Sequence, residues 1–160
     1  MHRLALVVLA AVALSACSPS SERAVTGEAG ASAIAVTDAL CRPTPNGRQV
    51  TGCYMNLTSP VDDTLVSVES PVAALAQVHE TRMESNMMMM RELEAGLPLP
   101  AGEAVQLKPG GNHVMLMGVR EPLRAGQTVA LTLTFANAAP VEVTANVGQP
   151  PASGEDHSGH

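Results

Sequence analysis

Alternation of apolar and polar residues near the carboxyl end of the chain limits the fold more than any other feature. Within residues 128–135 the apolar side chains fall at every second position, and Val141–Val147 repeats the pattern. Side chains of a β-strand point alternately to its two faces, so this pattern predicts strands that bury one face in a core. The apolar positions of the first strand are Val129, Leu131, Leu133 and Phe135.

Similar short runs recur along the chain and are separated by turns rich in Pro and Gly. No segment has the pattern of a long helix, although Pro71–Ala76 fits a single helical turn. Many short strands at near-regular spacing predict a single all-β domain, either a sandwich or a barrel. Besides Thr128–Ala136 and Val141–Val147, we expect strands at Ile34–Leu40, Val50–Thr58, Thr64–Glu69, Ala76–Met83, Met87–Arg91, Ala104–Lys108 and His113–Met117.

Composition excludes several classes of function. The net charge is -6, and the chain has one Phe, one Tyr and no Trp. It therefore lacks both the basic surface and the aromatic platforms with which proteins bind nucleic acids. No Ser-His-Asp pattern and no phosphate-binding loop is present, so we do not expect an enzyme.

The first residues have the pattern of an export signal. Arg3 precedes an unbroken apolar run, Leu4–Leu14, which is too short to span a bilayer. The following Ser-Ala-Cys17 completes a sequence that resembles the bacterial lipoprotein box, which predicts a signal peptide over 1–16 and lipidation of Cys17. Ordinary cleavage near Ala16 is the alternative. Ser18 favours the outer membrane.

The remaining segments follow from this reading. Residues 17–33 are small and polar and are expected to form a flexible tether, followed by one domain over 34–147 and a disordered tail over 148–160. Anchoring by lipid places the domain in the periplasm. The tail contains His157 and His160, and a solvated tail is the favoured interpretation.

Two further cysteines, Cys41 and Cys53, flank a segment with turn residues. An exported protein meets an oxidising compartment, so we expect a disulfide that joins two neighbouring strands. A redox or metal-binding pair is the alternative, but the spacing matches neither Cys-x-x-Cys motifs nor the close pairs of zinc sites.

Methionine and histidine are concentrated in one part of the chain. Residues 79–117 hold seven of the eight methionines beyond the initiator and both histidines of the expected domain, His79 and His113. Period two puts His113, Met115 and Met117 on one face of their strand, opposite Val114 and Leu116. The same rule puts His79 with Met83 and separates Met88 and Met90 from Met87 and Met89.

Imidazole and thioether together form a soft, neutral set of ligands. Such a set suits Cu(I) better than Zn(II) or Mg(II). Methionine that fills a core poor in aromatic residues is the alternative for any single position. It does not explain why so many methionines lie close to both histidines in the sequence.

This stretch resembles the periplasmic copper chaperones of the PCuAC family. The family pattern is a His, ten residues, a Met, a spacer and then His-x-Met. Here His79 is followed after ten residues by Met90 and, after twenty-two more, by His113-Val-Met115, a spacer one residue longer than usual. The block from Lys108 to Met117, Lys-Pro-Gly-Gly-Asn-His-Val-Met-Leu-Met, also matches.

The resemblance implies a cupredoxin-like Greek-key β-sandwich of short antiparallel strands that binds one Cu(I). By position, the ligands are His79, Met90, His113 and Met115, with Met88 and Met117 as possible auxiliary ligands. The implied function is delivery of copper toward the CuA centre of cytochrome c oxidase or its assembly factors.

Expected partners are therefore a copper-accepting protein and, through the lipid alone, a membrane, with the protein acting as a monomer. A competing hypothesis is a structural or adhesive envelope lipoprotein whose Met-rich surface binds a partner protein. Electron transfer at a blue-copper site is disfavoured, because it needs a Cys thiolate beside two His, and neither Cys41 nor Cys53 lies in such a loop.

Overall fold

The computed structural model describes residues 33–45 and 47–150. The predicted signal peptide, the lipidated Cys17, the tether up to residue 32 and the tail from residue 151 lie outside these residues. None of the described residues forms a helix of the length and apolarity that crossing a membrane requires. Ten strands are present: β1 (Ala35–Cys41), β2 (Val50–Thr58), β3 (Asp63–Glu69), β4 (Leu75–Glu84), β5 (Met87–Glu92), β6 (Leu97–Leu99), β7 (Ala104–Leu107), β8 (His113–Met117), β9 (Thr128–Phe135) and β10 (Val141–Val147).

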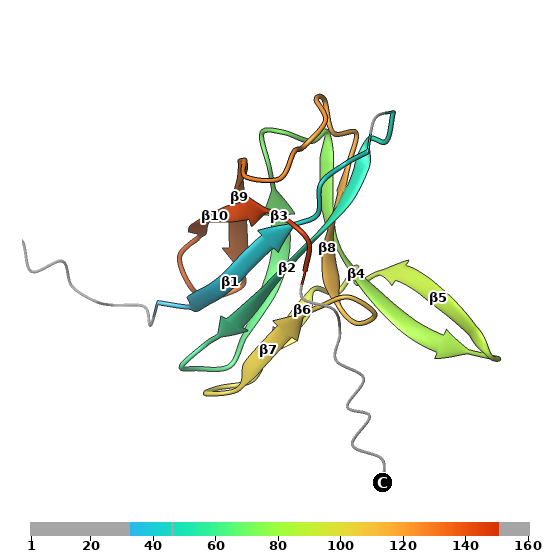
Figure 1. The fold of residues 1–160 in the computed structure, drawn as a ribbon. Helices are drawn as coiled ribbons and strands as arrows, with labels where there is room; N and C mark the ends of the chain where they lie inside the picture. The colour runs from blue at the N-terminus through green and yellow to red at the C-terminus, as the bar shows by residue number, and fades with distance from the viewer. Residues whose placement is uncertain (1–32, 46, 151–160) are drawn as a thin grey trace, which may run out of the picture.

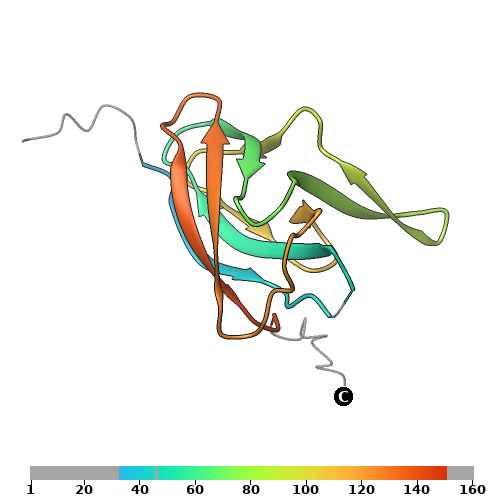
Figure 2. The ribbon, with the colours of Figure 1, turned by 90° about the horizontal axis from the view of Figure 1, so that it is seen from above.

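The strands form a continuous sheet that folds over on itself into a sandwich (Figures 1 and 2). The order is β5-β4-β8-β2-β1-β10-β9-β3-β6, and β7 pairs with β2. This confirms the predicted all-β sandwich. One ladder departs from the predicted antiparallel pairing, because β1 runs parallel to β10 on one side and antiparallel to β2 on the other. The first strand therefore connects the two layers.

Side chains of alternating positions fill the space between the layers. All four apolar side chains predicted for the core on β9 are buried, and so are Val114 and Leu116 of β8. Met55 of β2 is 1% exposed and lies in this core. Every methionine from Met83 to Met117 is at least partly exposed. Core filling therefore accounts for Met55 and leaves the other methionines unexplained.

Two segments differ from the sequence-based expectations. The strand β6 was not predicted, because it has three residues and Pro98 at its centre; it pairs with β3 and buries Leu97 and Leu99. The single helical turn predicted at Pro71–Ala76 is wrong. Turn and bend residues precede β4 there, and the N–H of Ala74 donates to the carbonyl oxygens of Met117 and Gly118 at the end of β8.

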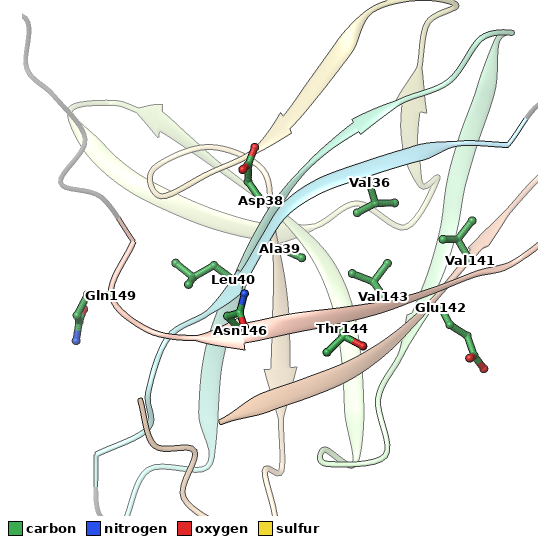
Figure 3. Close-up of a pocket in the computed structure, with 10 residues that line it drawn as sticks. All are labelled: Val36, Asp38, Ala39, Leu40, Val141, Glu142, Val143, Thr144, Asn146 and Gln149. Atoms are coloured by element: carbon green, nitrogen blue, oxygen red, sulfur yellow. The ribbon is translucent and has the colours of Figure 1, made fainter. Parts of the chain in front are cut away.

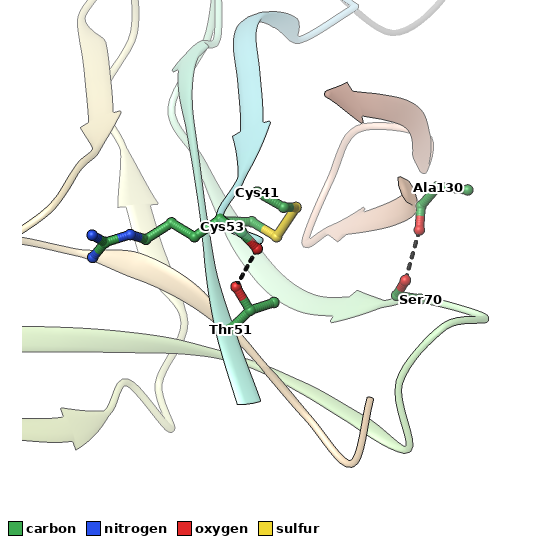
Figure 4. The surroundings of a disulfide bond; sticks show 6 residues. Cys41, Thr51, Cys53, Ser70 and Ala130 are labelled. Atoms are coloured by element: carbon green, nitrogen blue, oxygen red, sulfur yellow. Dashed lines mark hydrogen bonds between the residues drawn. A yellow bond between two sulfur atoms is a disulfide. The ribbon is translucent and has the colours of Figure 1, made fainter. Parts of the chain in front are cut away.

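A disulfide joins Cys41, the last residue of β1, to Cys53 of β2 (Figure 4). Cys41 and Cys53 are direct cross-strand partners, and neither side chain is accessible to solvent. Beside them, the hydroxyl of Thr51 donates to the carbonyl oxygen of Arg42 at 2.7 Å. The bond thus ties β1 to β2, and β2 pairs with β8 along its other edge.

Candidate metal centre

Two histidines lie side by side on the strands β4 and β8. His79 and His113 are direct cross-strand partners, and their ring centroids are 6.1 Å apart. Directly opposed residues of an antiparallel pair point to the same face of the sheet. His79 is half-buried and His113 is 5% exposed. The sheet thus brings together two imidazoles that are 34 residues apart in the sequence.

The strand β8 adds thioethers on the same face. Val114 and Leu116 point into the core, while Met115 and Met117 share the face of His113 and are half-buried. Gly52 of β2 lies opposite Met115, and the hydroxyl of Tyr54 occupies the space that a side chain at Gly52 would need. The ring of Tyr54, on the same face of β2, lies 6.4 Å from that of His113.

The hairpin of β4 and β5 carries the other methionines and extends away from the sandwich (Figures 1 and 2). Thr81 is paired with Met90 and Met83 with Met88, so these side chains share the face of His79. Met87 and Met89 are paired with Glu84 and Arg82 on the opposite face. The predicted separation of the two pairs of methionines is therefore correct.

The turn of this hairpin determines that register. Ser85 and Asn86 form a two-residue connection with φ of 48° and 66°. Positive φ at both central residues is the geometry of a type I′ turn, whose twist matches that of the flanking strands. Asn is one of the few non-glycine residues that adopts it readily. A shift of one residue would exchange the two methionine faces.

A hollow of about 890 Å³ lies between the hairpin and the loop that joins β1 to β2. Four of the predicted or auxiliary ligands line it: Met88, Met90, His113 and Met115. His79 lies beside His113, outside this lining, and Met117 lies on the same face farther along β8. Among the described residues of the lining, Arg42 and Arg48 alone are charged. The structure therefore places three predicted ligands around one space and the fourth next to it.

A backbone carbonyl determines the protonation of His113. Its Nδ1 lies 3.0 Å from the carbonyl oxygen of Gly111, which can only accept, so Nδ1 carries the proton. The same carbonyl accepts the N–H of Thr81 at 3.3 Å, which ties the loop before β8 to β4. In the neutral ring, Nε2 then holds the free electron pair that a metal requires.

His79 has the opposite tautomer. Its Nε2 donates to the side-chain oxygen of Gln77 at 3.3 Å, and its Nδ1 is buried without a hydrogen-bond partner in the structure. Burial lowers the pKa of His79, as does the positive charge that His113 can carry, and Glu92 opposes these effects. The ring is therefore neutral at neutral pH. A buried, unpaired imidazole nitrogen fits the coordination of a metal ion.

Hard ligands do not gather anywhere among the described residues. No group of three or more His, Cys, Asp or Glu side chains in 33–45 and 47–150 is arranged to hold a metal. A second hollow lies between β1 and β10 (Figure 3), but its lining, which includes Val36, Asp38 and Asn146, contains no His, Cys or Met. Among the described residues, imidazole and thioether side chains therefore occur together only on the face of His79 and His113.

Sequence reasoning missed three residues that support this face. Gln77 and Gly111 form hydrogen bonds with the histidines, and the ring of Tyr54 lies tilted beside that of His113. Gln77 could have been found, because period two puts it on the face of His79. Gly111 is only two residues from His113, but its contact depends on the conformation of the loop before β8. The position of Tyr54 depends on the pairing of β2 with β8, which no local pattern reveals.

Solved structures define the class of this fold. The chain is similar to a copper-bound PCuAC domain from PmoF2, with 24% identity and a TM-score of 0.61 over 75% of this chain and 97% of that one. It is also similar to the Cu(I) form of DR1885 from Deinococcus radiodurans, with 27% identity and a TM-score of 0.57 over 81% and 85%. The fold is that of a PCuAC domain.

A family model described as "Putative lipoprotein LpqE-like" matches residues 34–147, and the chain belongs to this family. It is 36% identical over 95 residues to "Putative lipoprotein Lxx21020" of Leifsonia xyli subsp. xyli (strain CTCB07), a match that covers 59% of this chain. The match covers 57% of the length of that relative. The predicted resemblance to PCuAC proteins is thus confirmed.

Proposed function

We propose that this protein is a copper carrier of the cell envelope that binds one Cu(I) through His79, His113, Met115 and Met90. The observation that carries the proposal is the paired histidines, whose hydrogen bonds leave one ring nitrogen of each free beside exposed thioethers. The likeness to copper-bound and Cu(I)-bound structures supports it.

The donor set suits transport of the ion. Thioether and neutral imidazole are soft ligands without charge, which favour Cu(I) over harder ions. Thioether sulfur has no proton to lose, so only the histidines make affinity depend on pH. The hollow opens to solvent between the hairpin and the β1–β2 loop. An acceptor can therefore approach the ion and replace these ligands one at a time.

We further propose where the protein is located and which protein receives its copper. Family names support a lipoprotein, which agrees with the expected lipidation of Cys17 and a flexible tether in the periplasm. The acceptor is a CuA centre of cytochrome c oxidase or one of its assembly factors, as the resemblance to PCuAC proteins implies. A thiolate-containing acceptor binds Cu(I) more strongly than thioethers do, so transfer would be downhill.

The test is an anaerobic titration of the chain from Ser18 onward, which lacks the thiol of Cys17, with Cu(I) in competition with a chromophoric chelator. Wild type is compared with His113→Ala/Met115→Ala. The matched control is Met87→Leu/Met89→Leu, on the opposite face of the hairpin. We expect one tight equivalent in wild type and control, and its loss in the His113/Met115 variant.

A partner-binding lipoprotein is the second candidate, favoured by the five exposed methionines of the hairpin. Such a protein has no need of the paired histidines. Failure of wild type to compete with even a weak chelator would overturn the carrier and favour this alternative.

A further inference from the structure

We propose that Met83 and Met88, near the tip of the β4–β5 hairpin, form a second and exposed Cu(I) site that receives the ion before it reaches the histidines. The two residues are direct cross-strand partners on the face of His79. They are 64% and 57% exposed. The destination of the ion rests on the proposed function, but binding at this pair does not.

The geometry allows both sulfurs to hold one ion. Directly opposite residues have Cβ atoms about 4.5–5.5 Å apart, and methionine has three rotatable bonds with which to close the remaining distance. Met90 follows Met88 on the same face, at a distance of about 7 Å along the strand. A third thioether is thus within reach.

Packing does not explain this pair. Both side chains are more than half exposed, so neither contributes its apolar surface to a core. The opposite face of the same hairpin carries charged side chains, and Glu80 there accepts hydrogen bonds from Arg82 and Arg91. Met87 and Met89 lie on that face opposite Glu84 and Arg82. A facing pair of thioethers therefore occurs on one side of the hairpin only.

A continuous series of donors leads inward from this pair. Met88 and Met90 both line the hollow that contains His113 and Met115, whereas Met83 lies outside it. At each step one thioether or imidazole replaces another, while copper stays Cu(I) and no proton or electron is exchanged. A site of two thioethers binds more weakly than one that includes two imidazoles, so the ion moves toward the histidines.

The pair can be observed directly by NMR of the chain from Ser18 onward, labelled at the methionine methyl groups. Cu(I) is added anaerobically as its acetonitrile complex. We expect the Met83 and Met88 methyl signals to shift beyond the first equivalent, while the Met87 signal, at 62% exposure, does not move. Equal shifts at Met83 and Met87 would overturn the site.

To test whether Met83 speeds the delivery of Cu(I) to the histidines, a variant must leave the hollow intact. Met83→Leu conserves volume and removes a thioether outside the lining of the hollow, and Met87→Leu is the matched control across the hairpin. We expect Met83→Leu to take up its first equivalent several-fold more slowly in stopped flow, with unchanged affinity in chelator competition. Equal uptake rates in the two variants would overturn the loading role.

The results that would overturn the tip site differ from the result that would overturn the proposed carrier function. If the proposed function is wrong, wild type binds no tight equivalent. If only the tip site is wrong, the tight equivalent remains and the Met83 methyl signal does not shift.

Discussion

His79 and His113 lie directly opposite each other on β4 and β8, and their hydrogen bonds select different tautomers. His113 holds its proton on Nδ1, toward the carbonyl oxygen of Gly111, whereas His79 holds its proton on Nε2, toward Gln77. One ring therefore offers Nε2 and the other Nδ1. A backbone carbonyl orients the ring of His113, and a side chain of the same strand orients the ring of His79. The two rings therefore need little rearrangement to accept an ion.

Replacement of Gln77 by leucine removes the acceptor that holds His79. Loss of such an outer partner typically lowers metal affinity by about 10–100-fold. We expect Gln77→Leu to weaken Cu(I) binding by about 10-fold, measured by chelator competition. The control is Gln106→Leu on β7, a strand that pairs with β2 and not with β4 or β8. Equal affinities for the two variants would show that Gln77 does not orient the ring.

The two arginines of the hollow give a prediction about rates. Arg42 and Arg48 are the charged residues in the described part of its lining, on a chain with a net charge of -6. A local positive charge accelerates the approach of anions, and salt reduces the effect. We expect Arg42→Glu/Arg48→Glu to slow copper uptake from the anionic bathocuproine disulfonate complex at low salt, in stopped flow.

Arg120→Glu/Arg124→Glu makes the same change in net charge away from the hollow and serves as the control. The difference between the two variants should shrink as salt is added. If both slow uptake equally, net charge rather than the arginines of the hollow governs the rate.

Alternation along the chain was enough to predict most of the sheet. On β9, Val129, Leu131 and Leu133 are buried as expected, because period two is a local property of any half-buried strand. The strand β6 was missed because three residues around Pro98 are too short for a pattern. The parallel ladder between β1 and β10 joins the two ends of the domain, which no local signal reports.

The residue types of the candidate metal centre could be read from the sequence, but the pairing that brings them together could not. Parity alone separates Met88 and Met90 from Met87 and Met89, and the structure agrees. The pairing of His79 with His113 depends on how β4 meets β8, across a connection that includes β5, β6 and β7. The turn at Ser85 and Asn86 decides which methionines face the histidines.

The disulfide gives a prediction about stability. Cys41 and Cys53 are 12 residues apart, and both are buried between β1 and β2. Closing a loop of this size in the unfolded chain is worth about 3 kcal/mol. We expect Cys41→Ala/Cys53→Ala to lower the free energy of unfolding by about this amount in urea. An unchanged midpoint for the variant, compared with oxidised wild type, would contradict the structural role of the bond.

Acid should destabilise the protein through Asp63, which is 7% exposed. Burial by itself raises the pKa of Asp63, but backbone N–H groups, including those of Thr64, Asn137 and Ala138, outweigh it and hold the pKa below its usual value. The folded state then binds fewer protons than the unfolded state. The stabilisation is therefore complete above the unfolded pKa of about 4 and is lost as pH falls through the lower, folded value.

Urea unfolding at several pH values between 7 and 2.5 tests this role of Asp63. We expect Asp63→Asn to be less stable than wild type at pH 7, because a neutral amide accepts the backbone N–H groups more weakly than a carboxylate. Below about pH 4 the difference should shrink, since wild type then loses the same charge. Glu103→Gln, which removes an exposed carboxylate, is the control. A difference between wild type and Asp63→Asn that stays constant at every pH would mean that Asp63 stabilises the fold by shape rather than by charge.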